Sequence, residues 1–214
     1  MNKKILLIGG GGHCKSVLDS LLELNKYLEV GIIDKKDNIG SSVLGVPVVG
    51  CDDDLPVLFK DGYKYAFVTV GSIGNPSLRI KLYNVLSEIG YEIPSIIDFS
   101  AKVSKNAKIE QGVFVGKQSL VNAGSFIQKG AIINSGTIIE HDCQIGAFAH
   151  IAPGAVIGGG VTIGDNSHIG SNVTIKQQVN IGSNSIIGMG SVVLQNIEDS
   201  IMAYGNPCRE VKKL

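Results

Sequence analysis

From residue 97 onward, an aliphatic side chain recurs at every sixth position of the chain. Seventeen successive positions in this register are Ile or Val, and the register never slips. They are Ile97, Val103, Ile109, Val115, Val121, Ile127, Ile133, Ile139, Ile145, Ile151, Ile157, Ile163, Ile169, Ile175, Ile181, Ile187 and Val193. The residue two places before each is small or β-branched, as at Ser125, Ala155 and Val173. Chance enrichment does not produce so regular a pattern, so the repeat dictates the fold of this half of the chain.

A period of six residues excludes an α-helix, whose period is 3.6 residues. It equals three periods of a β-strand, so each repeat places one bulky and one small side chain inside a short strand and then turns. Glycine often follows the aliphatic residue, as at Gly116, Gly158 and Gly170. We assign these glycines to the turns, because glycine tolerates positive φ. A chain with 28 glycines and 6% aromatic residues suits a backbone that turns this often.

The repeat resembles the hexapeptides of left-handed parallel β-helix acyltransferases, in which three hexapeptides form one triangular coil of 18 residues. The resemblance runs from about Ser95 to Ile197, which implies between five and six coils. It also implies that residues 18 apart lie directly above one another.

The first 94 residues lack the repeat and alternate between apolar strands and helical patterns. We expect strands at 4–8, 30–33 and 66–70, and helices through 17–24, from 52–56 and over 76–89. Such alternation predicts a parallel βαβ sheet with right-handed crossovers. This segment is too short for two mononucleotide-binding halves, so it is expected to hold a mononucleotide.

Four glycines, Gly9 to Gly12, stand between the first strand and the first helix. A GxGxxG motif would need glycine at Cys14 or Lys15, so that motif is absent, and the glycines also fit a simple tight turn. Amides at a helix N-terminus favour phosphate, however. Asp34, at the end of the next strand, has the position of a carboxylate that accepts from a ribose hydroxyl. We therefore favour phosphate or nucleotide binding over a purely structural turn.

Charge and composition exclude several classes of protein. Lys plus Arg and Asp plus Glu are both 19, so the basic surface of a nucleic-acid-binding protein is not expected. No apolar run has the length of a membrane span. Lys3 and Lys4 give the N-terminus a basic start, but the first apolar stretch ends at Gly9, too early for a signal peptide. Four cysteines without a CxxC pair suggest reduced thiols and a cytoplasmic protein.

Taken together, the two halves resemble the bacterial sugar acetyltransferases of the NeuD/PglD type over essentially the whole chain. The matching features are Gly11-Gly12-His13 with Lys15, Asp34, Val70-Gly71, Ile139-Glu140-His141-Asp142-Cys143, the coil from His150 to Ala155, and Tyr204-Gly205-Asn206-Pro207. The predicted fold class is thus α/β plus β: a small Rossmann-like domain (1–94) followed by a left-handed parallel β-helix with a C-terminal tail (95–214). The His-Glu pair common in the family is His141-Asp142 here, with a shorter carboxylate.

His141 can also be argued from its neighbours in the repeat. It lies two residues past an interior Ile, at an outward coil corner, with Gly159 one coil above and Ala123 one coil below. A surface histidine is ordinarily just solvated. The flanking carboxylates, Glu140 and Asp142, and the absence of bulky neighbours instead favour a general base. The resemblance implies the same role, with Asp142 orienting the imidazole.

Two other histidines, His150 and His168, are 18 apart and are expected to stack on one face. A metal site of the kind found in β-helical carbonic anhydrases is disfavoured, because the HxxxxH spacing of those enzymes is absent. By resemblance, His150 contacts acetyl-CoA, together with Gly159 and Ser171. His168 is left with a solvated or interface role, and Cys143, at a small interior position, reads as packing rather than as a nucleophile.

These observations and the resemblance together predict acetyl transfer from acetyl-CoA to an amine, or alternatively a hydroxyl, on a sugar. A homotrimer would place acetyl-CoA between neighbouring β-helices, backbone amides near Gly159 would receive the oxyanion, and no metal is required. The nucleotide part of the substrate is assigned to the N-terminal residues Gly11, Gly12, His13, Asp34, Lys35 and Gly71. The alternatives are O-acetylation of sialic acid, a metal-dependent lyase or hydrolase on the same β-helix, and a non-catalytic sugar-nucleotide-binding protein. The sequence does not indicate which nucleotide or which sugar is used.

Overall fold

A computed structural model describes residues 3–214 and divides them into two compact units. The first comprises residues up to 72 together with 77–96, and the second comprises 73–76 together with 97–214. Segment 73–76, between the last strand and the last helix of the first unit, thus belongs to the second unit. No helix among residues 3–214 is long and apolar enough to cross a membrane.

The first unit is built on a five-stranded sheet in the order β3-β4-β2-β1-β5. Its strands are β1 (Lys4–Ile8), β2 (Glu29–Ile33), β3 (Ser42–Val43), β4 (Val46–Gly50) and β5 (Tyr63–Val68). β1 pairs in parallel with β2 and β5, and β2 with β4, while β3 runs antiparallel to β4. Ile5, Leu6 and Leu7 in β1 are fully buried, as expected of a central parallel strand covered on both faces. The parallel α/β arrangement is confirmed.

Three α-helices accompany this sheet: α1 (Gly12–Leu24), α2 (Leu55–Lys60) and α3 (Ser77–Ile89). Two 3-10 turns, η1 (Lys36–Asn38) and η2 (Asp52–Asp54), follow β2 and β4. Two details differ from the sequence analysis. The strand expected at 66–70 is Tyr63–Val68, and the hairpin of β3 and β4 was not foreseen. β4 packs closely on β2, where a Cβ on Gly31 would lie 2.8 Å from Val49 Cγ2.

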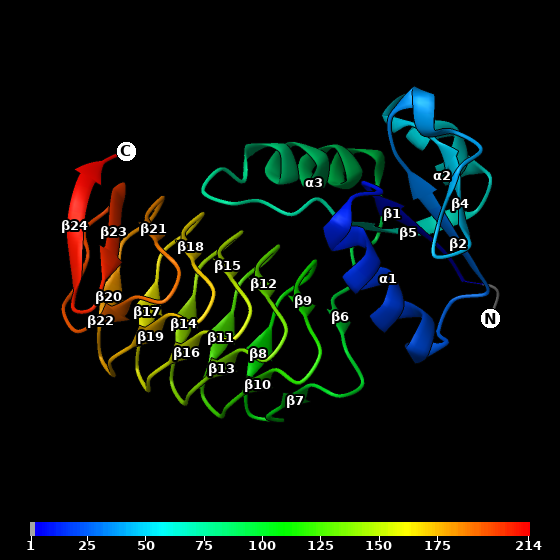
Figure 1. Cartoon of the computed structure of the whole chain (residues 1–214). Coiled ribbons are helices and arrows are strands. Elements are labelled where there is room, and N and C mark those ends of the chain that lie inside the picture. Colours follow the sequence, from blue (N-terminus) through cyan, green and yellow to red (C-terminus); the bar gives the residue numbers. More distant parts are fainter. Residues whose placement is uncertain (1–2) are drawn as a thin grey trace. The chain divides into compact units, whose positions relative to one another are not determined.

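The second unit is the left-handed parallel β-helix predicted from the repeat. Its strands stack coil on coil in Figure 1, from the green β6 to the orange β22. We name its three sheets after the strands of one coil. The β13 sheet contains β7 (Lys102–Val103), β10 (Leu120–Val121), β13 (Ile138–Ile139), β16 (Val156–Ile157), β19 (Thr174–Ile175) and β22 (Val192–Val193). The β14 sheet contains β8 (Lys108–Ile109), β11 (Phe126–Ile127), β14 (Gln144–Ile145), β17 (Thr162–Ile163) and β20 (Asn180–Ile181).

The β15 sheet contains β6 (Ile96–Ile97), β9 (Phe114–Val115), β12 (Ile132–Ile133), β15 (His150–Ile151), β18 (His168–Ile169), β21 (Ile186–Ile187), β23 (Ile201–Gly205) and β24 (Cys208–Lys213). The hairpin of β23 and β24, with a cis peptide bond before Pro207, completes the C-terminal end of this sheet. Such terminal elements cover the last repeat of a solenoid.

Residues 18 apart pair across neighbouring coils, as the repeat predicts. Ile139, for example, pairs with Val121 below and Ile157 above. The aliphatic positions form one continuous core, in which only the first three, Ile97, Val103 and Ile109, are partly exposed. The register of the repeat therefore specifies which side chains point inward.

The glycines after the aliphatic positions have a different role from the one expected. Positive φ occurs two residues later, in a series of every sixth residue that includes Gly124, Asp142 and Gly160. Gly158 instead lies against the next coil, where an added Cβ would be 2.6 Å from the backbone nitrogen of Gln177. These glycines are needed for the close approach of neighbouring coils and not for a positive φ.

Candidate active site

His141 and Asp142 lie at the corner where the chain passes from β13 to β14. Asp142 has a left-handed conformation with φ 59°. Its amide donates to the carbonyl of Ala123 at 3.0 Å, and the carbonyl of His141 accepts from the Gly160 amide at 2.9 Å. Hydrogen bonds to the coils on both sides therefore fix the backbone that carries the two side chains.

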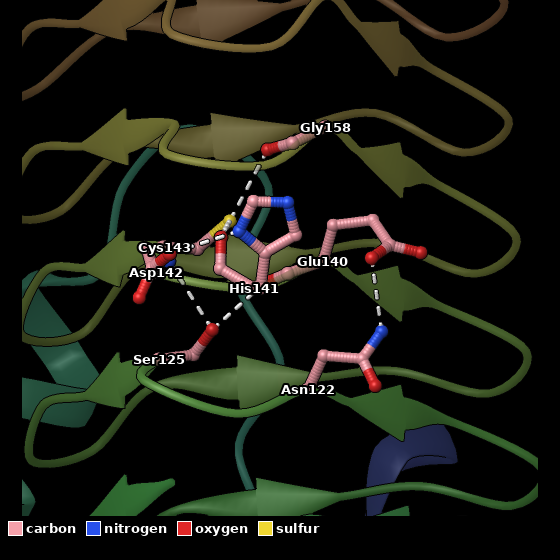
Figure 2. A network of polar contacts seen from close by, with 7 residues as sticks. All are labelled: Asn122, Ser125, Glu140, His141, Asp142, Cys143 and Gly158. Carbon is pink, nitrogen blue, oxygen red and sulfur yellow. Dashed lines mark hydrogen bonds and ion pairs between the residues drawn. The ribbon is translucent and has the colours of Figure 1, made fainter.

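The two side chains contact each other directly (Figure 2). His141 Nδ1 lies 2.9 Å from Asp142 Oδ2. Their side chains are 65% and 71% exposed, so a substrate can reach them. A carboxylate on one ring nitrogen fixes the tautomer and orientation of an imidazole. Gly124, one coil below, leaves room for the Asp142 carboxylate, which a Cβ at that position would strike.

The imidazole itself lies over Gly159. A Cβ on Gly159 would be 2.6 Å from His141 Nε2 and 2.7 Å from Cε1. The room left by the absent side chain at Gly159 is thus partly taken by the imidazole. Among residues 3–214, the Gly159 amide has no acceptor, whereas its neighbours Gly158 and Gly160 donate to carbonyls of adjacent coils. A ring nitrogen and an available amide are therefore side by side.

Beneath the pair, a network of polar contacts holds the corner (Figure 2). The Ser125 hydroxyl donates to the Glu140 carbonyl at 2.8 Å and accepts from the Cys143 amide at 3.2 Å. Asn122 Nδ2 donates to Glu140 Oε2 at 3.0 Å. The Cys143 thiol is buried and donates to the Gly158 carbonyl, and burial raises its pKa. Cys143 therefore has the environment of a packing residue and not of a thiolate nucleophile.

His150 and His168 occur on adjacent strands of the β15 sheet, as expected. Their ring centroids are 5.0 Å apart and the rings meet edge to face at 77°. The residues are only 9% and 8% exposed, so the solvated role expected for His168 does not apply in this chain. The hexapeptide register places His168 on the outer face of the β-helix, but it does not reveal whether other residues cover that face. Within residues 3–214, no group of three or more His, Cys, Asp or Glu could hold a metal ion.

The residues assigned to acetyl-CoA are spread over the β-helix. Gly159 adjoins His141, but His150 lies on the β15 sheet and Ser171 at the turn after β18. A single chain therefore does not bring His150 and Ser171 to the corner that carries His141.

In the first unit, a cavity of about 430 Å³ opens at the carboxyl ends of the strands. It is lined by Ile8, Gly9, Ile33, Asp34, Lys35, Lys36, Cys51, Asp52, Asp53, Val70, Leu78 and Leu82. Asp34 Oδ1 accepts from the Lys35 amide at 2.9 Å and Oδ2 from Asn38 Nδ2 at 3.0 Å. Gly10 passes so close to Asp34 that an added Cβ would be 2.6 Å from Oδ2.

The other residues assigned to the nucleotide do not line this cavity. Gly11 precedes α1 and Gly12 begins it, both exposed, and no side chain caps this helix. His13 lies against Gly71, where an added Cβ would be 3.3 Å from His13 Cβ. Burial, and secondarily the charge of Arg79, lowers the pKa of His13 to about 4. His13 is therefore a neutral, largely buried side chain.

Four polar residues of the cavity lining were not expected there from the sequence: Lys36, Cys51, Asp52 and Asp53. The run Asp52–Asp54 was noticed only as the start of a helix. Its position beside Asp34 follows from the pairing of β4 with β2, which depends on the unforeseen hairpin.

Comparison with known proteins decides the family. The family described as PglD N-terminal domain matches residues 4–86, and the bacterial transferase hexapeptide family matches 124–159, 142–177 and 160–195. The perosamine N-acetyltransferase of Caulobacter crescentus was solved as its H141N variant with CoA and GDP-perosamine. It is 36% identical to this chain and superposes with a TM-score of 0.92. The match covers 98% of this chain and 97% of that chain. The chain belongs to the PglD-type sugar acetyltransferases.

A second PglD-type structure agrees with this assignment. The acetyltransferase domain of PglB from Neisseria gonorrhoeae, solved with acetyl coenzyme A, is 33% identical, with 99% of this chain and 100% of that chain covered and a TM-score of 0.90. WeeI from Acinetobacter baumannii shares the fold, with a TM-score of 0.81 and 23% identity. That match covers 98% of this chain and 100% of WeeI. A search of curated proteins gave no match. The resemblance noted from the sequence is thereby confirmed.

Proposed function

We propose that this PglD-type enzyme transfers the acetyl group of acetyl-CoA to the amine of a nucleotide-linked amino sugar. The observation that carries this proposal is the exposed His141–Asp142 pair over Gly159, in a chain that matches a GDP-perosamine N-acetyltransferase over nearly its whole length. The relatives were solved with CoA, acetyl coenzyme A and GDP-perosamine, which supports the same two substrate classes here.

His141 is the general base in this proposal. Because the Asp142 carboxylate accepts from Nδ1–H, Nε2 has a free lone pair. It removes the proton of the amine while the amine nitrogen bonds to the acetyl carbon. The C–S bond of the thioester then breaks, and the proton passes from His141 to the departing thiolate. The Gly159 amide, which has no acceptor among residues 3–214, is assigned to the negative charge that develops on the acetyl oxygen.

The N-terminal cavity is assigned to the nucleotide. Asp34, at the end of β2, is the acceptor for a ribose hydroxyl, and Lys35 lines the cavity next to it. Gly11 and Gly12, at the uncapped start of α1, offer amides to the diphosphate. His13 and Gly71 stay assigned to this site. The burial of His13 supports a role in positioning the glycine turn.

The active enzyme is proposed to be a homotrimer. The outward residues of the β13 sheet include Leu120, Ile138 and Val156, whereas those of the β14 sheet include Gln144 and Thr162. An apolar outer face beside the corner with His141 is typical of a surface that pairs with another chain. A neighbouring β-helix is also the source from which the separated residues His150 and Ser171 would complete the site.

The reaction is proposed to take place in the cytoplasm. All four cysteines are free and buried, as is usual for proteins of a reducing compartment.

The proposed function is tested by assaying CoA release with acetyl-CoA and a panel of acceptors. The panel contains GDP-, UDP- and dTDP-linked amino sugars, their hydroxyl counterparts and sialic acid. We expect turnover with an amino sugar carrying a nucleotide, and product mass increased by one acetyl group. Turnover with sialic acid alone would establish O-acetylation instead, and nucleotide binding without any CoA release would indicate a binding protein.

A further inference from the structure

The carboxyl edge of the sheet in the first unit arranges its polar groups in the order of a nucleotide. Along the edge of the sheet, α1 begins after β1, Asp34 follows β2, and Asp52 follows β4 beyond it. Ligands of open α/β sheets bind at the carboxyl ends of the strands. With the diphosphate at the start of α1 and the ribose at Asp34, the base extends toward the end of β4.

The cavity combines apolar walls with a carboxylate. Ile33, Leu78 and Leu82 contribute apolar side chains to the lining, as is usual for a pocket that takes a planar ring. Guanosine fits easily within a cavity of this volume.

The three successive carboxylates of η2 differ in what they contact. Asp54 accepts from the Cys51 amide at 2.8 Å and so holds the turn. Asp53 pairs with Lys36 at 3.2 Å. Asp52 lines the cavity and has no hydrogen bond or ion pair from residues 3–214. Burial, the neighbouring Asp53 and the Asp34 charge raise the pKa of Asp52, with Lys81 opposing. Asp52 is therefore an exposed carboxylate at the cavity that no group among residues 3–214 engages.

We propose that the nucleotide is a guanosine diphosphate and that the Asp52 carboxylate recognises its base. This inference rests on the proposed function and specifies its substrate class. Guanine presents two adjacent donors, N1–H and the 2-amino group, which one carboxylate can accept together, as carboxylates do with other paired donors. Uracil and thymine present a single N–H between two carbonyl oxygens, which a carboxylate repels. Adenine presents an amino group beside an acceptor nitrogen.

The test is calorimetric binding of free nucleoside diphosphates to the whole protein. For the wild type we expect GDP to bind at least about 10-fold more tightly than UDP or dTDP, and more tightly than IDP, which lacks the 2-amino group. Asp52→Asn is expected to weaken GDP roughly 10- to 100-fold, the range for a hydrogen bond to a charged group. It should also remove the difference between GDP and IDP.

Asp53→Asn is the matched control, because it removes a neighbouring charge that already pairs with Lys36. It should affect GDP and IDP alike and keep their ratio. The proposal is overturned if UDP or dTDP binds as tightly as GDP, or if Asp52→Asn retains the GDP/IDP ratio. In those cases nucleotide binding, and with it the proposed function, would still stand. Failure of every diphosphate to bind would contradict both, and thermal unfolding of each variant excludes misfolding as the cause.

Discussion

At the scale of single residues, the proposed chemistry depends on one imidazole nitrogen. His141 Nε2 lies over Gly159 because Asp142 engages Nδ1 and because glycine leaves that space. The side chains of His141 and Asp142 are both exposed, so the position of the imidazole ring is set by the backbone of the corner and by the Asp142 carboxylate. The equivalent corner one coil above supplies Gly159, over which the base lies.

Replacing His141 with Ala is expected to lower kcat by about 10²- to 10⁴-fold, the usual contribution of a general base. The effect should lie mainly in kcat, because the interaction is made in the transition state. Asp142→Asn should cost less, since the imidazole remains but is less well oriented. Steady-state kinetics of the purified variants, with circular dichroism as the control for folding, provide the measurement. A wild-type rate for His141→Ala would exclude His141 as the base.

His13 allows a prediction about stability and pH. Its pKa is lowered to about 4 in the folded protein by burial and by Arg79, against about 6.5 when unfolded. The unfolded chain therefore binds the proton first, so stability present above pH 6.5 is lost as the pH falls toward 4. The loss from this residue amounts to about 3 kcal/mol.

Denaturant unfolding of the wild type and of His13→Gln at pH 7 and pH 4.5 measures this loss. The variant cannot gain the proton, so its free energy of unfolding should fall less between the two pH values. An equal fall in both proteins would show that His13 does not titrate as described.

At the scale of elements, the sequence predicts the β-helix far better than the first unit. A core position every six residues repeats over the whole β-helix, so every coil supports the same register. The hairpin of β3 and β4 has no such redundancy, because β3 has two residues and β4 contains Pro47. Asp52 could be recognised as a cavity residue only once β4 was known to lie beside β2.

The glycines of the repeat show the same limit at closer range. Sequence reveals that a side chain is absent at Gly158 but not why. A strained φ and a close neighbouring coil both select glycine. Only the three-dimensional stacking distinguishes them, and here an added Cβ would meet the backbone of the next coil. His168 is a parallel case, since its outward direction was predictable and its burial was not.

The register of the β-helix is tested by Ile157→Asp. Ile157 is fully buried in the core, so the substitution places an unpaired charge there and is expected to destabilise the protein by roughly 4 kcal/mol or more. Gln144→Asp introduces the same charge at an exposed outward position and should leave the melting temperature nearly unchanged. Equal melting temperatures for both variants would contradict the register.

At the scale of the whole molecule, the separation of the assigned residues supports the proposed homotrimer. The corner with His141 and the residues His150 and Ser171 lie on different parts of the β-helix, while the nucleotide cavity belongs to the first unit. The resemblance predicts this division, but the repeat does not indicate which sheet would form the interface, because it is nearly identical on all three sheets. The outward residues of the middle coils break that symmetry, since the β13 sheet presents Ile138 and Val156 where the β14 sheet presents Gln144 and Thr162.

Charge on the β13 sheet is therefore expected to abolish assembly and catalysis together. Wild-type protein should sediment at three times the 22.5 kDa mass of the chain. Val156→Glu, on the outer face of the β13 sheet, buries a charge in the proposed interface and should sediment as a single chain. Because the nucleotide cavity lies within the first unit, this variant should still bind the diphosphate while its CoA release falls to background.

Thr162→Glu, on the outer face of the β14 sheet, should remain trimeric and active. A fully active Val156→Glu monomer would show that one chain holds a complete site, and a single-chain wild type at micromolar concentration would contradict the trimer itself.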